Sequence, residues 1–121
     1  MVLRIFLVED NPVIRRSLIE TLEDLLAVDV IGWSETEHEA CSRLLALAEG
    51  WDVALVDLFL LSGSGLGVVR CLQQRHAGQK VFVVSNYATD EMRHRATALG
   101  ADAVLDKSTE LDALIDRLAV S

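Results

Sequence analysis

The sequence predicts one α/β domain built around a single parallel sheet. The chain has 121 residues, 51% of them apolar, which is the size and composition of one ordinary domain spanning residues 1–121. Five short apolar runs alternate with five segments of helical spacing. Strict alternation of strands and helices is typical of a parallel sheet with helices on both faces.

The five expected strands are short and mostly β-branched, and at least three of them are apolar on both faces, as buried parallel strands are. They are Leu3–Val8, Val28–Trp33, Val53–Val56, Val81–Val84 and Ala103–Leu105. Five such strands commonly take the order 2-1-3-4-5, the flavodoxin-like (βα)5 doubly wound arrangement. Ligands of these sheets bind beyond the carboxyl ends of the strands, close to the point where the strand order reverses.

Capping signals predict where the first two helices begin. Asn11 and Pro12 supply an N-cap and a first-turn proline ahead of an apolar series at helical spacing. Ser34 and Glu37 have the spacing of a capping box, which predicts that the second helix begins after Ser34.

The remaining three helices carry similar signals. Ser64 precedes the third helical segment, and Thr89 opens the fourth. Gly100 follows the fourth segment, where a glycine commonly ends a helix. Ser108 or Thr109 is expected to cap the last helix.

The charge distribution argues against direct binding to nucleic acid. The formal net charge is −8, and residues 1–61 carry 4 basic and 12 acidic side chains. A duplex would repel such a surface. The acidic half could attract a divalent cation or a basic partner, although solvated helix faces account for most of these acids.

Neither a membrane segment nor a disulfide framework is expected. The first apolar run, Ile5–Val8, is followed at once by Glu9 and Asp10, which excludes a signal peptide or a membrane span and favours a cytoplasmic protein. Cys41 and Cys71 are too few for a disulfide framework, and no second cysteine or histidine lies at ligand spacing. We expect both to pack in the core or at its boundary rather than to bind metal or act in redox chemistry.

Polar side chains end four of the expected strands, and the fold brings these ends together. They are Glu9 and Asp10, Asp57, Ser85 and Lys107. Three carboxylates without a counter-charge repel one another, and a divalent cation such as Mg²⁺ removes that conflict. An ammonium and a hydroxyl beside Asp57 favour a site that receives a phosphoryl group on this carboxylate. Asp106, by contrast, is expected to have only a turn or capping role.

These residues lie in motifs that resemble the receiver domain of two-component response regulators, and the resemblance runs from Leu3 to the last helix. The motifs are Leu7-Val8-Glu9-Asp10-Asn11, Leu55-Val56-Asp57-Leu58, Ser62-Gly63-Ser64-Gly65-Leu66, Val83-Val84-Ser85, and Gly100-Ala101-Asp102 through Lys107. The resemblance implies a phosphorelay protein in which Asp57 accepts a phosphoryl group from a sensor histidine kinase or a histidine phosphotransfer protein.

The resemblance also implies the other roles in the site. Asp10 would bind Mg²⁺ directly, as would Asp57, and Mn²⁺ can take the place of Mg²⁺. Glu9 would bind the ion through water, and the backbone carbonyl of Phe59 would complete the protein ligands. Ser85 would bond the phosphoryl oxygen after transfer, and Lys107 would pair with it.

Four residues concern switching and gating: Ser85, and three positions that depart from the common pattern of these domains. Val104 stands three residues before Lys107, where an aromatic switch residue is common, and Tyr87 is the nearest aromatic that could substitute for it. Phe59 and Tyr87 are bulky where many relatives carry small or polar groups. We expect their rings to shield an aspartyl-phosphate from water and to slow its hydrolysis.

The leading functional hypothesis is a binding module controlled by phosphorylation, which catalyses only its own phosphorylation and dephosphorylation. It would act on a downstream protein target or through an output domain outside this chain. One alternative is an aspartyl-phosphate phosphohydrolase, but Phe59 stands where many such enzymes place a second acid. The other is a small flavodoxin-like ligand-binding protein, but Asn11 and Pro12 stand where a glycine-rich phosphate loop would follow the first strand.

Overall fold

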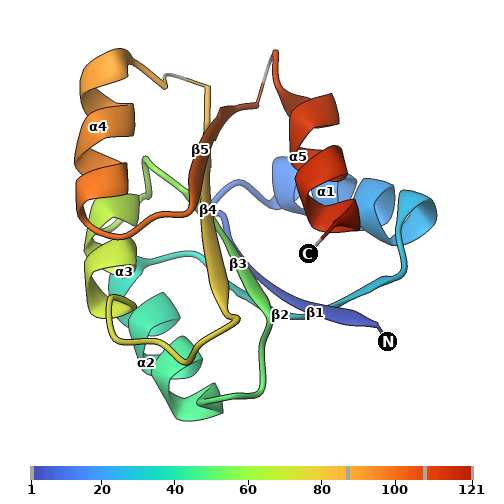
Figure 1. Ribbon diagram of the computed structural model, residues 1–121, viewed down its shortest axis with the longest axis horizontal. Helices are drawn as coiled ribbons and strands as arrows, with labels where there is room; N and C mark the ends of the chain where they lie inside the picture. The colour runs from blue at the N-terminus through green and yellow to red at the C-terminus, as the bar shows by residue number, and fades with distance from the viewer. Residues whose placement is uncertain (1, 87, 108, 121) are drawn as a thin grey trace.

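The computed structural model shows a parallel sheet covered by helices on both faces (Figure 1). It describes residues 2–86, 88–107 and 109–120. The strands are β1 (Leu3–Val8), β2 (Val28–Ser34), β3 (Val53–Asp57), β4 (Lys80–Ser85) and β5 (Ala103–Asp106). The helices are α1 (Pro12–Leu25), α2 (Glu37–Leu47), α3 (Gly65–Cys71), α4 (Asp90–Ala98) and α5 (Leu111–Ala119). In the described part of the chain, no helix is both long and apolar enough to cross a membrane.

The order of the strands is β2-β1-β3-β4-β5, which confirms the predicted flavodoxin-like arrangement. All neighbours pair in parallel. At the centre, Val8 of β1 lies beside Val56 of β3, and Asp57 lies beside Val84 of β4. The strand order reverses between β1 and β3, so the crevice expected for a ligand opens beyond the ends of these two strands.

Four strands end one residue beyond the apolar runs that predicted them. Their final residues are Ser34, Asp57, Ser85 and Asp106. Main-chain pairing in the sheet therefore fixes the position of these polar residues, which would be less restrained in a loop.

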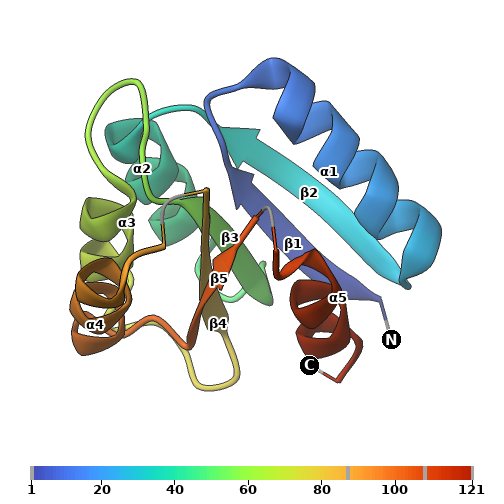
Figure 2. The ribbon, with the colours of Figure 1, turned by 90° about the horizontal axis from the view of Figure 1, so that it is seen from above.

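The helices divide between the two faces of the sheet, as Figure 2 shows from above. Helices α1 and α5 cover one face, where Leu22, Leu114 and Leu118 are buried against the sheet. Helices α2, α3 and α4 cover the other face, where Leu44 and Ala96 belong to a second buried cluster. Both faces of the central strands are therefore apolar, which explains the continuous apolar runs in the sequence.

Three of the predicted helix starts are confirmed by their caps. The Asn11 side chain accepts hydrogen bonds from the backbone N–H groups of Val13 and Ile14, at 2.9 and 3.1 Å. Ser64 and Thr89 cap α3 and α4 with their hydroxyl groups. These side chains satisfy donors that the first helical turn leaves without a partner.

The predicted capping box of the second helix is wrong. Ser34 is the last residue of β2 and is fully buried. Its backbone carbonyl accepts a hydrogen bond from the backbone N–H of Glu9 at 3.0 Å. The cap is Thr36, whose hydroxyl accepts from the backbone N–H of Glu39 at 3.2 Å. Pairing of β2 with β1 continues through Ser34, so the helix begins only at Glu37.

The predicted cap of the last helix is also wrong at Thr109. The residue before α5 is Glu110, which makes no capping hydrogen bond with its side chain. Its carboxylate instead bonds Arg93 and the backbone N–H of Asp106. Ser108, the other expected cap, lies outside the described residues.

A disulfide joins Cys41 of α2 to Cys71 of α3, and the sequence did not predict it. The expected packing at the boundary of the core is confirmed for both cysteines. Their Cα atoms lie 6.2 Å apart, within the usual span of a disulfide. The two residues are 30 positions apart in sequence. Only the side-by-side packing of α2 and α3 brings them together, and the spacing of two cysteines carries no signal of that packing.

Candidate functional site

The acidic pair Glu9–Asp10 follows β1 directly and is held by its backbone. The N–H of Glu9 donates to the carbonyl of Ser34, which extends the pairing of β1 with β2 by one residue. The N–H of Asn11 donates to the Glu9 carboxylate at 3.3 Å. Glu9 is buried, with 2% of its surface exposed, whereas Asp10 is half-buried. The turn into α1 therefore presents both acids at the end of β1.

Asp57 is the last residue of β3 and is 8% exposed. The chain turns sharply after it, and one carboxylate oxygen lies 3.4 Å from the backbone nitrogen of Phe59, which donates to it. Helix α3 begins close by, because a Cβ on Gly65 would lie 2.2 Å from the Asp57 carbonyl oxygen. Only a glycine allows this approach. Asp57 is thus fixed between a central strand and the start of a helix.

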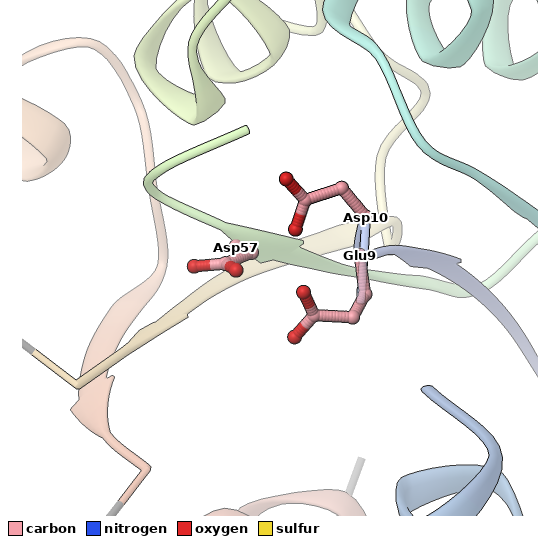
Figure 3. A group of neighbouring side chains, drawn as sticks. All are labelled: Glu9, Asp10 and Asp57. Carbon is pink, nitrogen blue, oxygen red and sulfur yellow. The ribbon is translucent and has the colours of Figure 1, made fainter. Parts of the chain in front are cut away.

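The three carboxylates meet at the ends of β1 and β3 (Figure 3). Glu9, Asp10 and Asp57 each offer one oxygen within 4.8 Å of the others. The predicted acidic cluster is therefore assembled by the fold. Oxygen atoms of carboxylates are the ligands that Mg²⁺ and Mn²⁺ prefer, so the donor set fits a hard divalent cation.

Lys107 places its ammonium directly in this cluster. It forms ion pairs with the Glu9 carboxylate and, at 3.3 Å, with the Asp57 carboxylate. The sequence predicted an ammonium beside Asp57 but gave no sign of its pairing with Glu9, which lies 98 positions earlier. The ammonium offsets the repulsion among the carboxylates without a metal ion.

Ser85 ends β4 and is fully buried. It pairs in register with Asp106 at the end of β5, and its carbonyl accepts a hydrogen bond from the backbone N–H of Lys107 at 2.9 Å. The same stretch of backbone therefore positions Ser85 and Lys107. The structure brings both to the same end of the sheet as Asp57.

The other three residues assigned to switching and gating, besides Ser85, lie in different surroundings. Phe59 is half-exposed on the loop after Asp57, with 53% of its surface accessible. Val104 is buried within β5. Tyr87 lies outside the described residues, so its expected role is not placed.

The cluster of Glu9, Asp10 and Asp57 at the ends of β1 and β3 is called the acidic corner below, and sequence reasoning missed two side chains that support it. Arg15 of α1 is buried, donates to the Glu9 carbonyl at 3.0 Å, and stacks on the Trp33 ring with its guanidinium carbon 3.7 Å from the centroid. Glu37 of α2 accepts from the backbone N–H of Ser64 at 2.9 Å. Two features of the sequence could have indicated these contacts. Arg15 lies on the apolar side of its helix, and small residues surround Ser64.

An apolar cleft of about 350 Å³ lies beside the acidic corner, between α1 and α5. Its rim includes Asp106 and Lys107, and its walls include Ile14, Leu18 and Leu114. The chemistry-bearing carboxylates lie outside this cleft.

The fold agrees with comparisons to known proteins. The profile of the response regulator receiver domain family matches residues 5–119. The DNA-binding transcriptional activator DevR/DosR of Mycobacterium tuberculosis is 32% identical over 86% of this chain and 47% of its own length. A cyclic di-GMP phosphodiesterase of Thermotoga maritima is 30% identical over 91% of this chain and 28% of its own length. The chain thus spans less than half of these curated relatives.

A solved structure shows the same architecture. It is a response regulator protein from Burkholderia pseudomallei, described with a phosphorylated aspartic acid, a calcium ion and citrate. It is 27% identical to this chain, with a TM-score of 0.78, and the match covers 98% of this chain and 66% of that one.

Proposed function

Because this chain belongs to the response regulator receiver domain family, we propose that Asp57 accepts a phosphoryl group from a phosphohistidine of a sensor histidine kinase or a histidine phosphotransfer protein. One observation carries the proposal: the Asp57 carboxylate ends a central strand with the Lys107 ammonium 3.3 Å away. The phosphorylated aspartic acid described for the Burkholderia relative supports the same chemistry.

The transfer step follows from the groups at this corner. A carboxylate oxygen of Asp57 attacks phosphorus while the phosphorus–nitrogen bond breaks, and the electron pair of that bond stays on the departing imidazole. We expect Lys107 to pair with the phosphoryl oxygens and the Ser85 hydroxyl to donate a hydrogen bond to one of them. Before transfer, the Lys107 ammonium pairs with the Asp57 carboxylate itself.

A divalent cation fits this proposal. Asp10, Asp57 and the Phe59 carbonyl would hold Mg²⁺ or Mn²⁺, with Glu9 bound through water. When bound, the ion supplies positive charge that offsets the phosphoryl oxygens and the clustered carboxylates. Glu9 and Asp57 each form an ion pair with Lys107. Two of the residues that would bind the ion are therefore already arranged around a positive charge.

The output of this domain is proposed to pass through protein contacts. The curated relatives are a DNA-binding activator and a phosphodiesterase, and both are longer than this chain. We expect phosphorylation to change binding of a protein target or of an output domain, while this domain itself turns over no substrate. The net charge of −8 argues against direct contact with nucleic acid.

Intact-mass measurement after incubation with acetyl phosphate and Mg²⁺ tests the proposal. The parent should gain a single phosphoryl adduct, and Asp57→Asn should gain none. Asp52→Asn is the matched control, because Asp52 precedes the same strand at its opposite end and pairs with Arg4. An adduct that persists in Asp57→Asn would contradict the assignment. Repeated turnover of a phosphoester would favour a phosphohydrolase, and absence of both reactions a ligand-binding protein.

Phe59 is proposed to lengthen the life of the phosphorylated state. Its half-exposed ring follows Asp57 by two positions, where it would hinder a water approaching the phosphorus and offers no carboxylate or amide to orient one. Phe59→Asn should therefore lose its phosphoryl group faster than the parent when the adduct is followed over time. Equal rates of loss in the two proteins would contradict the shielding role.

A further inference from the structure

Arg93 of α4 connects three segments of the chain through one guanidinium group. Its Nε donates to the carbonyl of Ala88 at 3.2 Å, and its Nη1 donates to the carbonyl of Val104 at 2.6 Å. Its Nη2 pairs with the carboxylate of Glu110 at 2.5 Å. The planar fork of an arginine can serve three acceptors in this way, whereas a lysine offers one point charge.

Glu110 continues the connection toward the site. The carboxylate oxygen that pairs with Arg93 also accepts from the backbone N–H of Asp106 at 3.1 Å. Its pKa lies below the ordinary value because it is hydrogen-bonded first by Arg93 and then by that N–H. Lys107 follows Asp106, and its own N–H bonds the Ser85 carbonyl. The contacts thus reach the backbone of Asp106, directly before Lys107, and the Lys107 N–H is itself bonded to the Ser85 loop.

The acceptors of Arg93 lie close in sequence to Ser85 and Lys107, the two residues that contact a phosphoryl group in the proposed function. Ala88 lies three residues after Ser85, and Val104 and Glu110 lie three residues before and after Lys107. Two of these acceptors are backbone carbonyls, so the guanidinium restrains main chain as well as a side chain. The side chains of Arg93 and Glu110 are only about one-third exposed, at 34% and 33%. An ion pair with these additional bonds is more restrained than an isolated surface pair.

We infer that Arg93 is a positioning residue that holds the loops of Ser85 and Lys107 in one arrangement and couples occupancy of Asp57 to helix α4. The inference rests on the proposed function of Asp57. It assigns the link between site and surface to a guanidinium, a carboxylate and two main-chain carbonyls. Binding at Asp57 that moves Ser85 or Lys107 must then also change the contacts of α4, since both share Arg93.

Calorimetric titration with beryllofluoride in the presence of Mg²⁺ tests this inference, since that complex mimics a phosphoryl group on a carboxylate. Arg93→Ala should bind it at least about fivefold more weakly than the parent, the lower range of measured coupling between sites. Arg95→Ala is the matched control, because Arg95 is an exposed arginine on the same helix, and should bind as the parent does. Arg93→Lys should recover only part of the loss.

A second variant separates coupling from a folding defect. Glu110→Gln should weaken beryllofluoride binding in the same direction, and the double variant with Arg93→Ala should be no weaker than Arg93→Ala alone, because both changes break one network. If folded Arg93→Ala binds beryllofluoride as tightly as the parent, the inference is overturned and the role of Asp57 is left intact. If Arg93→Ala fails to fold, unchanged affinity in Glu110→Gln has the same meaning. Failure of the parent to bind beryllofluoride would overturn the proposed function and the coupling together. Equal binding by the parent and by Asp57→Asn would do the same.

Discussion

Replacing Lys107 with methionine removes the ammonium of the acidic corner and keeps a side chain of similar length. In the structure that ammonium pairs with Glu9 and with Asp57, whose side chains are only 2% and 12% exposed. Without it, these two carboxylates and Asp10 lie within 4.8 Å of one another and lose their shared counter-charge. We therefore expect the metal-free variant to be markedly less stable than the parent.

The size of the effect follows from the burial of the pair. Removing one partner of a buried ion pair costs about 3–5 kcal/mol, and the lower figure applies here because the Lys107 side chain keeps partial access to solvent. For a chain of 121 residues, about 3 kcal/mol corresponds to a fall in Tm of roughly 12 °C. Mg²⁺ should restore more stability to the variant than it adds to the parent, since it replaces the missing charge.

Thermal unfolding followed by circular dichroism, first with a chelator and then with Mg²⁺, measures both effects. Lys80→Met is the matched control, because Lys80 is exposed at the start of β4 and pairs with Val53, at the opposite end of β3 from Asp57. Its Tm should stay within about 2 °C of the parent, as exposed substitutions usually do. Equal Tm values for the two methionine variants in chelator would refute the reasoning.

Three further changes have defined outcomes. Asp10→Ala should raise the metal-free Tm by roughly 4 °C, since it removes one of three crowded charges, and the gain should shrink with Mg²⁺. Reduction of the Cys41–Cys71 disulfide should lower stability by up to about 3.5 kcal/mol, the loop-entropy value for a separation of 30 residues. Hydrogen bonds from Arg4 hold the pKa of Asp52 below its ordinary value. The stabilisation from this pair is therefore fully present at pH values above the ordinary pKa, and it is lost as the pH falls through the lowered pKa. Asp52→Asn should therefore lose less stability than the parent between about pH 5 and pH 2.

Each of these changes has its own comparison. A metal-free Tm for Asp10→Ala at or below that of the parent would show that the carboxylates are not crowded. The Cys41→Ser variant should match the reduced parent and should not respond to a reductant, and a parent Tm insensitive to reductant would contradict the role of the disulfide. Parallel acid-unfolding curves for Asp52→Asn and the parent would contradict the linkage at Asp52.

The sequence was sufficient to predict the sheet and most of the acidic corner, because these depend on backbone pattern. Alternating apolar runs specify the strands, and the carboxyl ends of parallel strands must lie along one edge. Glu9 and Asp57 could thus be brought together without knowledge of any side-chain contact. The helix starts at Asn11 and Ser64 were equally local, since each cap bonds an N–H within three residues.

The contacts that escaped prediction involve side chains whose partners are distant in sequence. Lys107 could have pointed at Asp57 alone, and only the packed structure shows that its flexible stem also reaches Glu9. The acceptors of Arg93 come from two loops and a strand, and no local pattern around Arg93 indicates them. The error at Ser34 has the same origin, because pairing of two strands outweighed a local capping pattern.

The stacking of Arg15 on Trp33 gives the protein an optical reporter of its own acidic corner. Trp33 is 40% exposed, whereas Trp51, the other indole in the chain, is almost fully buried beneath the opposite end of the sheet. The guanidinium that lies against the Trp33 ring also holds the carbonyl of Glu9. Emission from Trp33 should therefore respond to movement of the turn that carries Glu9, and a Trp51→Phe background would remove the contribution of the buried indole.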